Sequence, residues 1–168
     1  MSKLIDRTGR RDDGWVLFTG DASVVKPGTK LLLPLDVYRE YRDRWLTHDG
    51  KLGVLLAPSD DPSTLANDLG HLSLIAIDFP SFTDGRGYSS ARLLRQRYRY
   101  AGELRAVGDV LIDQLAYLRR CGFDSFAPAH PLNAADAEAA LARYPDVYSP
   151  TVDGRVPIWA KRHGLAGN

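Results

Sequence analysis

The feature that most constrains the fold is an alternation of short apolar runs with segments of helical spacing between residues 52 and 148. The apolar runs fall at 52–57, 72–77, 103–107 and 123–127, and their lengths are typical of strands. Strands that alternate with helices are joined by right-handed crossovers, which make neighbouring strands parallel. The sequence therefore predicts an α/β domain with a mainly parallel sheet. That sheet is either open and doubly wound or part of a barrel, because the repeats are too few for an eight-fold barrel.

Helix-end signals place the elements around these strands. Asp36, Asp61 and Asp109 each precede a helical pattern and are expected to act as N-caps. Gly122 stands where a C′ glycine ends a helix. The expected helices cover 36–47, 62–70, 89–98 and 110–121, with another that begins at 133. Further short strands are expected at 15–18 and 31–33, which form an N-terminal β segment, and at 147–148.

Length and composition indicate one globular domain. The 168 residues suffice for a single well-buried core. We expect a polar N-terminal tail or short edge element at 1–13, a single α/β domain at 14–150 and a C-terminal extension at 151–168. The formal net charge of +1 argues against a dedicated nucleic-acid binder. One cysteine and the absence of a signal-peptide pattern or a long apolar run favour a cytoplasmic protein without a membrane anchor.

The chemically richest stretch is 78–91, between a predicted strand and an arginine-rich helix. A simple connector needs only a few residues, so this longer one favours a binding segment. In a parallel sheet the functional site lies at the carboxyl ends of the strands. Asp78, Asp109 and His130 fall at such ends and are the catalytic candidates. For each aspartate alone, and most of all for Asp109, a role as a cap or turn residue is the simpler interpretation.

A second hypothesis concerns anion binding at the start of the following helix. Free N–H groups at a helix start, with an arginine and hydroxyl groups nearby, can hold an anion or contact a partner. The simpler alternative is that Asp84 pairs with Arg86 and that Ser89 caps the helix. The residues assigned to this anion- or partner-binding site are Asp84, Gly85, Arg86, Gly87, Ser89 and Ser90.

The remaining reactive side chains restrict the chemistry. The histidines show no metal-ligand spacing, so no metal site is expected. Cys121 lies on the apolar face at the end of a predicted helix, where burial and the helix dipole disfavour a thiolate, and we expect it to be buried and unreactive. No flavin or nicotinamide fingerprint is present, so the cofactor, if there is one, stays unknown.

Three segments together resemble the bacterial family catalogued as domain of unknown function 934. They are the stretches from Phe79 to Arg95, from Gly102 to Leu115 and from Arg119 to Phe126. The resemblance implies a link to assimilatory sulfate and sulfite reduction, because members are usually encoded beside the sulfite reductase, and some are labelled oxidoreductases. It supplies no catalytic residues.

Two functions are therefore weighed. The first is an accessory protein of assimilatory sulfite reduction that binds the reductase system or its anionic substrate. The second is a small α/β enzyme, an oxidoreductase by the family label, acting on an anionic metabolite at the strand carboxyl ends. The sequence alone does not decide whether the protein is an enzyme.

Overall fold

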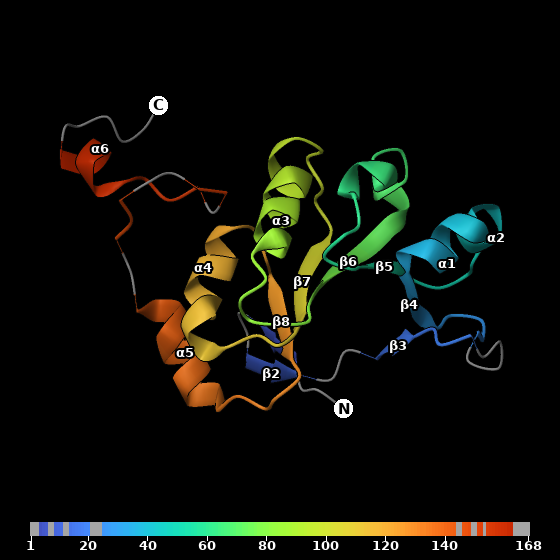
Figure 1. The fold of residues 1–168 in the computed structure, drawn as a ribbon, viewed down its shortest axis with the longest axis horizontal. Coiled ribbons are helices and arrows are strands. Elements are labelled where there is room, and N and C mark those ends of the chain that lie inside the picture. The colour runs from blue at the N-terminus through green and yellow to red at the C-terminus, as the bar shows by residue number, and fades with distance from the viewer. Residues whose placement is uncertain are drawn as a thin grey trace.

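The computed structural model describes residues 4–6, 9–11, 14–20, 25–143, 146–148, 151–152 and 154–162. Within these ranges eight strands form one sheet in the order β2-β1-β8-β7-β6-β5-β4-β3 (Figure 1). The strands are β1 (Leu4–Asp6), β2 (Gly9–Arg11), β3 (Trp15–Leu17), β4 (Lys30–Pro34), β5 (Leu52–Leu56), β6 (Leu72–Phe79), β7 (Glu103–Gly108) and β8 (Ser125–Pro128).

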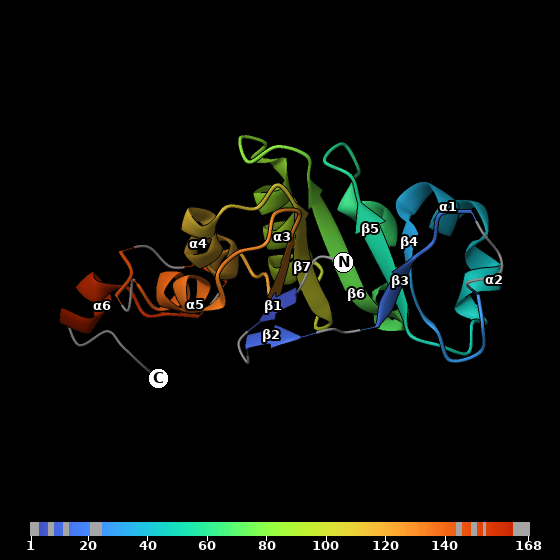
Figure 2. The ribbon, with the colours of Figure 1, turned by 90° about the horizontal axis from the view of Figure 1, so that it is seen from below.

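The strands from β3 to β8 are parallel and lie in the order of the chain. Because this order never reverses, right-handed crossovers carry the connecting helices to the same face. The sheet is curled like half of a barrel (Figure 2). This confirms the predicted α/β class with a parallel sheet and selects the partial barrel over the doubly wound alternative.

The N-terminal residues extend this sheet rather than only preceding it. Strand β1 pairs antiparallel with β8, where Ile5 faces Phe126, and β2 pairs antiparallel with β1. Ile5 is buried in the main core. Of the two expectations for this region, the structure shows the edge element.

Helices and turns fill the connections. They are α1 (Leu35–Glu40), α2 (Arg42–Leu46), the 3₁₀ helices η2 (Pro62–Leu65), η3 (Leu69–His71) and η4 (Ile112–Gln114), α3 (Arg86–Gln96), α4 (Leu115–Arg120), α5 (Ala134–Ala142) and α6 (Ile158–Arg162). The part of the chain that the structure describes holds no helix long and apolar enough to cross a membrane.

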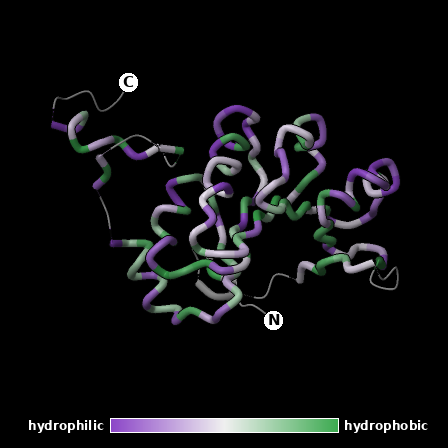
Figure 3. Tube along the Cα trace, viewed as in Figure 1, coloured by the Kyte–Doolittle hydropathy of each residue, from purple (hydrophilic) through white to green (hydrophobic). Residues whose placement is uncertain are grey.

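Two apolar clusters lie on opposite faces of the sheet. The larger one joins outer-face residues such as Val54, Ile75 and Ile77 to the helices. The smaller one, Leu32, Leu74 and Ala76, lies on the inner face. Residues in parallel register share a face, which explains why odd and even positions of β6 enter different clusters. Figure 3 shows the hydrophobic residues concentrated along the strands.

The inner face changes from apolar to ionic along the sheet. On β7 and β8, Arg105 donates to Glu103 at 2.7 Å, and the Ser125 hydroxyl donates to the same carboxylate at 2.5 Å. Arg105 is nearly fully buried. The concave face therefore combines an apolar half over β4–β6 with a hydrogen-bonded ion pair over β7–β8.

Several helix boundaries differ from the prediction. The helix expected at 36–47 is broken at Tyr41 into α1 and α2, and Pro34 rather than Asp36 holds the N-cap position. The Asp61 side chain does cap, accepting the Ser63 N–H at 2.8 Å, but 3₁₀ turns follow instead of an α-helix. The stretch between Pro62 and Gly70 allows only about two helical turns, which are marginal without more packing.

Other predicted helix ends agree with the structure. Gly122 adopts φ +109° after α4, as a C′ glycine does. Asn133 accepts the N–H groups of Ala135 and Asp136 and caps α5. Cys121 is fully buried in the core, and burial raises the pKa of its thiol, as expected. The strand predicted at 147–148 is wrong, because Val147 forms only an isolated bridge with Pro157 outside the sheet.

We expect Gly108→Ala to destabilise the protein strongly. Gly108 has φ +95°, and a Cβ there would lie 2.4 Å from the Phe79 carbonyl oxygen. The backbone strain alone costs about 1–3 kcal/mol. Urea denaturation of Gly108→Ala and of the control Gly70→Ala, where an added Cβ meets nothing within 4 Å, measures the difference. Equal free energies of unfolding for the two variants would contradict this assignment.

Candidate functional site

The parallel strands end at one edge of the sheet, and the sequence candidates gather there. Asp78 is the second-last residue of β6, Asp109 follows β7 and His130 follows β8. The segment of residues 80–85, here called the central loop, leaves the same edge and leads into α3. The edge therefore carries two distinct features, a cavity beside Asp78 and the central loop beside Asp109.

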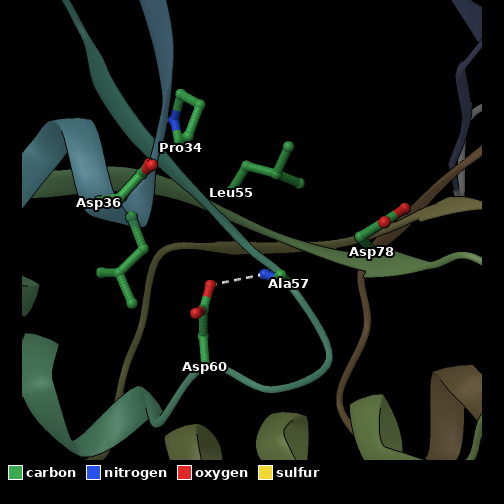
Figure 4. A pocket seen from close by; sticks show the side chains of 7 residues that line it. Pro34, Asp36, Leu55, Ala57, Asp60 and Asp78 are labelled. Carbon is green, nitrogen blue, oxygen red and sulfur yellow. Dashed lines mark hydrogen bonds between the residues drawn. The ribbon is translucent and has the colours of Figure 1, made fainter.

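The cavity opens on the inner face at the ends of β4, β5 and β6. Its volume is about 350 Å³. Asp78 reaches it from β6 and is half-buried, and burial raises the pKa of its carboxyl. In Figure 4, the Asp60 carboxylate points toward the backbone of Ala57, whose N–H it accepts at 2.7 Å. Asp78 lies on the opposite side of Leu55 from Pro34 and Asp36. The lining residues are Pro34, Leu35, Asp36, Leu55, Ala57, Asp60 and Asp78.

The chemistry of this cavity is apolar and acidic. Three of its lining residues are aspartates and none is basic. Within the described ranges, no group of three carboxylate, histidine or cysteine side chains has a geometry that could hold a metal ion. A half-buried carboxyl with a raised pKa is suited to proton transfer. An anionic substrate would be repelled here, so the cavity favours a neutral or cationic molecule.

Asp109 does not cap the following helix, and that prediction is wrong. Its carboxylate accepts the N–H of Phe82 in the central loop at 2.9 Å. The Phe82 carbonyl in turn accepts the Gln114 side-chain amide at 2.8 Å. Both backbone polar groups of Phe82 are thus held by side chains that follow β7. Asp109 is not among the residues that line the cavity, so it does not face Asp78 across it.

The start of α3 is closed by a residue of the chain itself. Asp84 accepts the backbone N–H of Arg86 at 3.2 Å and its guanidinium at 3.0 and 2.6 Å. This pairing lowers the pKa of the Asp84 carboxyl. A carboxylate therefore already occupies the place that an external anion would take. The alternative that Asp84 pairs with Arg86 describes this geometry, and anion binding by Arg86 stays a prediction.

The glycines and serines of this segment have other roles in the structure. Gly87 packs on Phe79, and a Cβ there would lie 2.6 Å from the ring. Gly85 precedes α3, which begins three residues before Ser89, so Ser89 is not the cap. The Ser90 hydroxyl donates to the Arg86 carbonyl within the helix. Gly87 is therefore explained by helix–sheet packing.

His130 is exposed in the bend after β8, and the structure does not place it in the cavity. Its catalytic role stays a prediction.

Three residues at this edge of the sheet were not predicted from the sequence as site residues. Asp36 and Asp60 follow β4 and β5, so the strand-end argument used for Asp78 would have found them. Gln114 offered no such signal, because it lies 32 residues from the backbone that it contacts.

Comparison with known proteins places the chain in a wider group. A family model described as a bacterial protein of unknown function, DUF934, matches residues 53–159. This range includes all three segments on which the resemblance rests, together with Asp78, the central loop and Asp109. No curated protein matches the sequence.

We expect Asp78→Asn to raise the melting temperature at pH 7. Since the folded-state pKa of Asp78 is raised, its contribution to stability is complete below the unfolded pKa of about 3.9 and is lost as pH rises through the folded value. At pH 7 the wild type therefore keeps a desolvated charge that asparagine lacks. The gain should shrink at pH 3, where the wild-type carboxyl is protonated.

Thermal denaturation at both pH values measures this effect. Asp49→Asn is the matched control, because Asp49 is an exposed aspartate in the turn before β5. A lower melting temperature for Asp78→Asn at pH 7 would show that the carboxylate is stabilised rather than strained.

Proposed function

The chain belongs to the bacterial DUF934 family, and we propose that it is an accessory protein of assimilatory sulfate and sulfite reduction that docks on the sulfite reductase system through its central loop. The identity of the partner rests on the family resemblance. The docking role rests on the way in which the central loop is held.

The observation that carries this proposal is the clamp on Phe82. Asp109 holds its N–H and Gln114 holds its carbonyl, while half of the Phe82 side chain is exposed, at 50%. An exposed aromatic ring on a fixed backbone keeps apolar surface in contact with water, which is unfavourable, and that part of the ring gains no burial within the monomer. A partner that covers such a ring loses little ordering entropy, which is the usual advantage of a preorganised contact.

Leu111 is a second exposed apolar residue whose backbone is held by the same side chain as Phe82. The Gln114 side chain that binds the Phe82 carbonyl also accepts the Leu111 N–H at 3.0 Å, so one amide joins the two segments. Leu111 is 40% exposed. Two exposed apolar side chains on one support offer a partner a small apolar contact, in which the aromatic ring is of a type enriched at protein interfaces.

The geometry supports protein docking better than capture of a small anion. Asp84 satisfies the Arg86 guanidinium and the first N–H of α3. An anion at the start of α3 would compete with this carboxylate, in an ion pair whose Arg86 side chain is 61% exposed. Calorimetric titration of the wild type and Arg86→Ala with sulfite or sulfate separates the two versions, because anion capture requires binding that Arg86→Ala weakens.

We expect Phe82→Ala to weaken binding to the sulfite reductase by about 30-fold, the effect of losing a hot spot of about 2 kcal/mol. Binding of purified protein to immobilised reductase measures this change. Tyr41→Ala is the control, because Tyr41 is equally exposed, at 49%, but lies between α1 and α2. No binding by the wild type, or equal binding by both variants, would refute the proposal.

The cavity at Asp78 favours a second function, that of a small enzyme. We infer that Asp78 would act there as a general acid or base, because its carboxyl is half-buried at the mouth of a half-barrel. The acidic lining changes the expected substrate from an anion to a neutral or cationic metabolite. A thermal-shift screen of such metabolites against the wild type and Asp78→Asn tests this function. A ligand that stabilises only the wild type would support it.

A further inference from the structure

The C-terminal arm, defined here as residues 146–162, forms a small unit outside both apolar clusters. Among the described residues, neither cluster includes one beyond Leu141. The arm is closed by its own contacts, in which the Ile158 N–H donates to the Val147 carbonyl at 2.8 Å and Lys161 pairs with Asp146 at 2.8 Å. Figures 1 and 2 both show α6 standing away from the sheet.

This arm presents aromatic side chains to solvent. Trp159 is 44% exposed and Tyr148 is 80% exposed. The Trp159 indole N–H donates to the Tyr148 carbonyl at 3.0 Å, which fixes the ring direction. Lys161 and Arg162 follow in the same helix and are exposed. The arm therefore carries a fixed indole in the same helix as Arg162 and as Lys161, which pairs with Asp146, although an isolated tryptophan gains most by burying its ring.

A groove on the same chain has the complementary chemistry. It lies between η4 and α5 and has a volume of about 430 Å³. Its apolar part consists of Ile112, Ala139 and Ala140, and its carboxylates are Asp113 and Asp136. Arg143 also lines it, but its guanidinium is 3.9 Å from the Asp113 carboxylate, and both side chains are largely exposed. The groove thus offers small apolar side chains for a ring and acidic groups for nearby cations.

The arm does not fill the groove of its own chain. Arg143 lines the groove only three residues before the arm begins, and Figure 1 shows α6 apart from α5. A second copy of the chain carries both surfaces, so two copies can exchange arms about a two-fold axis. In that arrangement each Trp159 is covered, and Arg162 meets the acidic side of the groove at Asp136.

We propose that this protein forms a homodimer in which Trp159 of each copy inserts into the groove formed by η4 and α5 of the other. The acidic groove residues select the arm through Arg162, since Lys161 already pairs with Asp146 inside the arm. The groove shares η4 with the Gln114 side chain that supports Phe82, so the dimer interface adjoins the proposed docking surface.

Sedimentation equilibrium of the full chain tests the proposal. We expect a dimer for the wild type and at least a ten-fold higher dimer dissociation constant for Trp159→Ala, with Tyr41→Ala unchanged. Far-UV circular dichroism establishes that each variant is folded. A wild type that stays monomeric at about 100 µM, or a dimer that Trp159→Ala leaves intact, would overturn it.

A charge exchange makes the test specific for the two surfaces. Arg162→Glu, and separately Asp136→Lys, should each weaken the dimer. The chain carrying both changes should regain it, because both partners are reversed. Failure of this rescue would refute the pairing. If the protein is monomeric and Trp159→Ala loses binding to the reductase, the pairing is also refuted and the arm is assigned to the reductase.

Discussion

The structure depends on the burial of β6 on both of its faces. Ile75 and Ile77 pack under the helices, while Leu74 and Ala76 lie inside the curl of the sheet. Strands covered on both faces are typical of parallel sheets, and β5 and β7 pair parallel with β6 over most of its length. Asp78 is the one ionisable residue of β6, and its position near the strand end brings the carboxyl to the mouth of the half-barrel. The raised pKa of that carboxyl is a consequence of the same burial.

Polar side chains then hold the long connection after β6 at both ends. At its start, Asp109 and Gln114 bind the two backbone groups of Phe82. At its end, Arg95 of α3 donates to the carbonyl groups of Tyr100, Gly102 and Gly122 and pairs with Asp124. Such bonds to buried or half-buried groups are costly to break singly, because the partner is left unsatisfied. The central loop is therefore a surface segment whose backbone is held by side chains of other segments, rather than a loose connector.

Two different surfaces lie at this edge of the sheet, an acidic cavity and an exposed apolar pair. The cavity on the inner side is lined by Asp78, Asp60, Asp36 and apolar residues, and the segments that follow β6 and β7 carry the exposed Phe82 and Leu111. A protein partner that covers Phe82 would lie at the same edge as the cavity. The accessory role and an enzymatic role at Asp78 are thus compatible within one molecule. The groove beside α5 shares η4 with the support of the central loop, so a dimer would cover surface next to Leu111, whereas the cavity at Asp78 has no lining residue in common with the groove.

The sequence by itself determined the parallel strands between residues 52 and 128 and the family, because apolar runs of strand length and their alternation with helical spacing are local signals. It left the order of the strands in the sheet open. It also placed Asn133, Gly122 and Cys121 correctly, since caps and C′ glycines act within one turn of the chain. It could not assign Asp109 or Gln114, whose partner lies about 30 residues away. It left the state of Arg86 open, because a guanidinium beside a carboxylate either pairs with it or reaches outward.

Only the tertiary structure decided these points. Parallel pairing of β6 with β7 brings Asp109 to the central loop, and the start of α3 at Arg86 lets Asp84 close the helix end. The curl of the sheet, which follows from a strand order that never reverses, creates the cavity beside Asp78. These are long-range consequences of how the strands pack, and no local pattern of residues contains them.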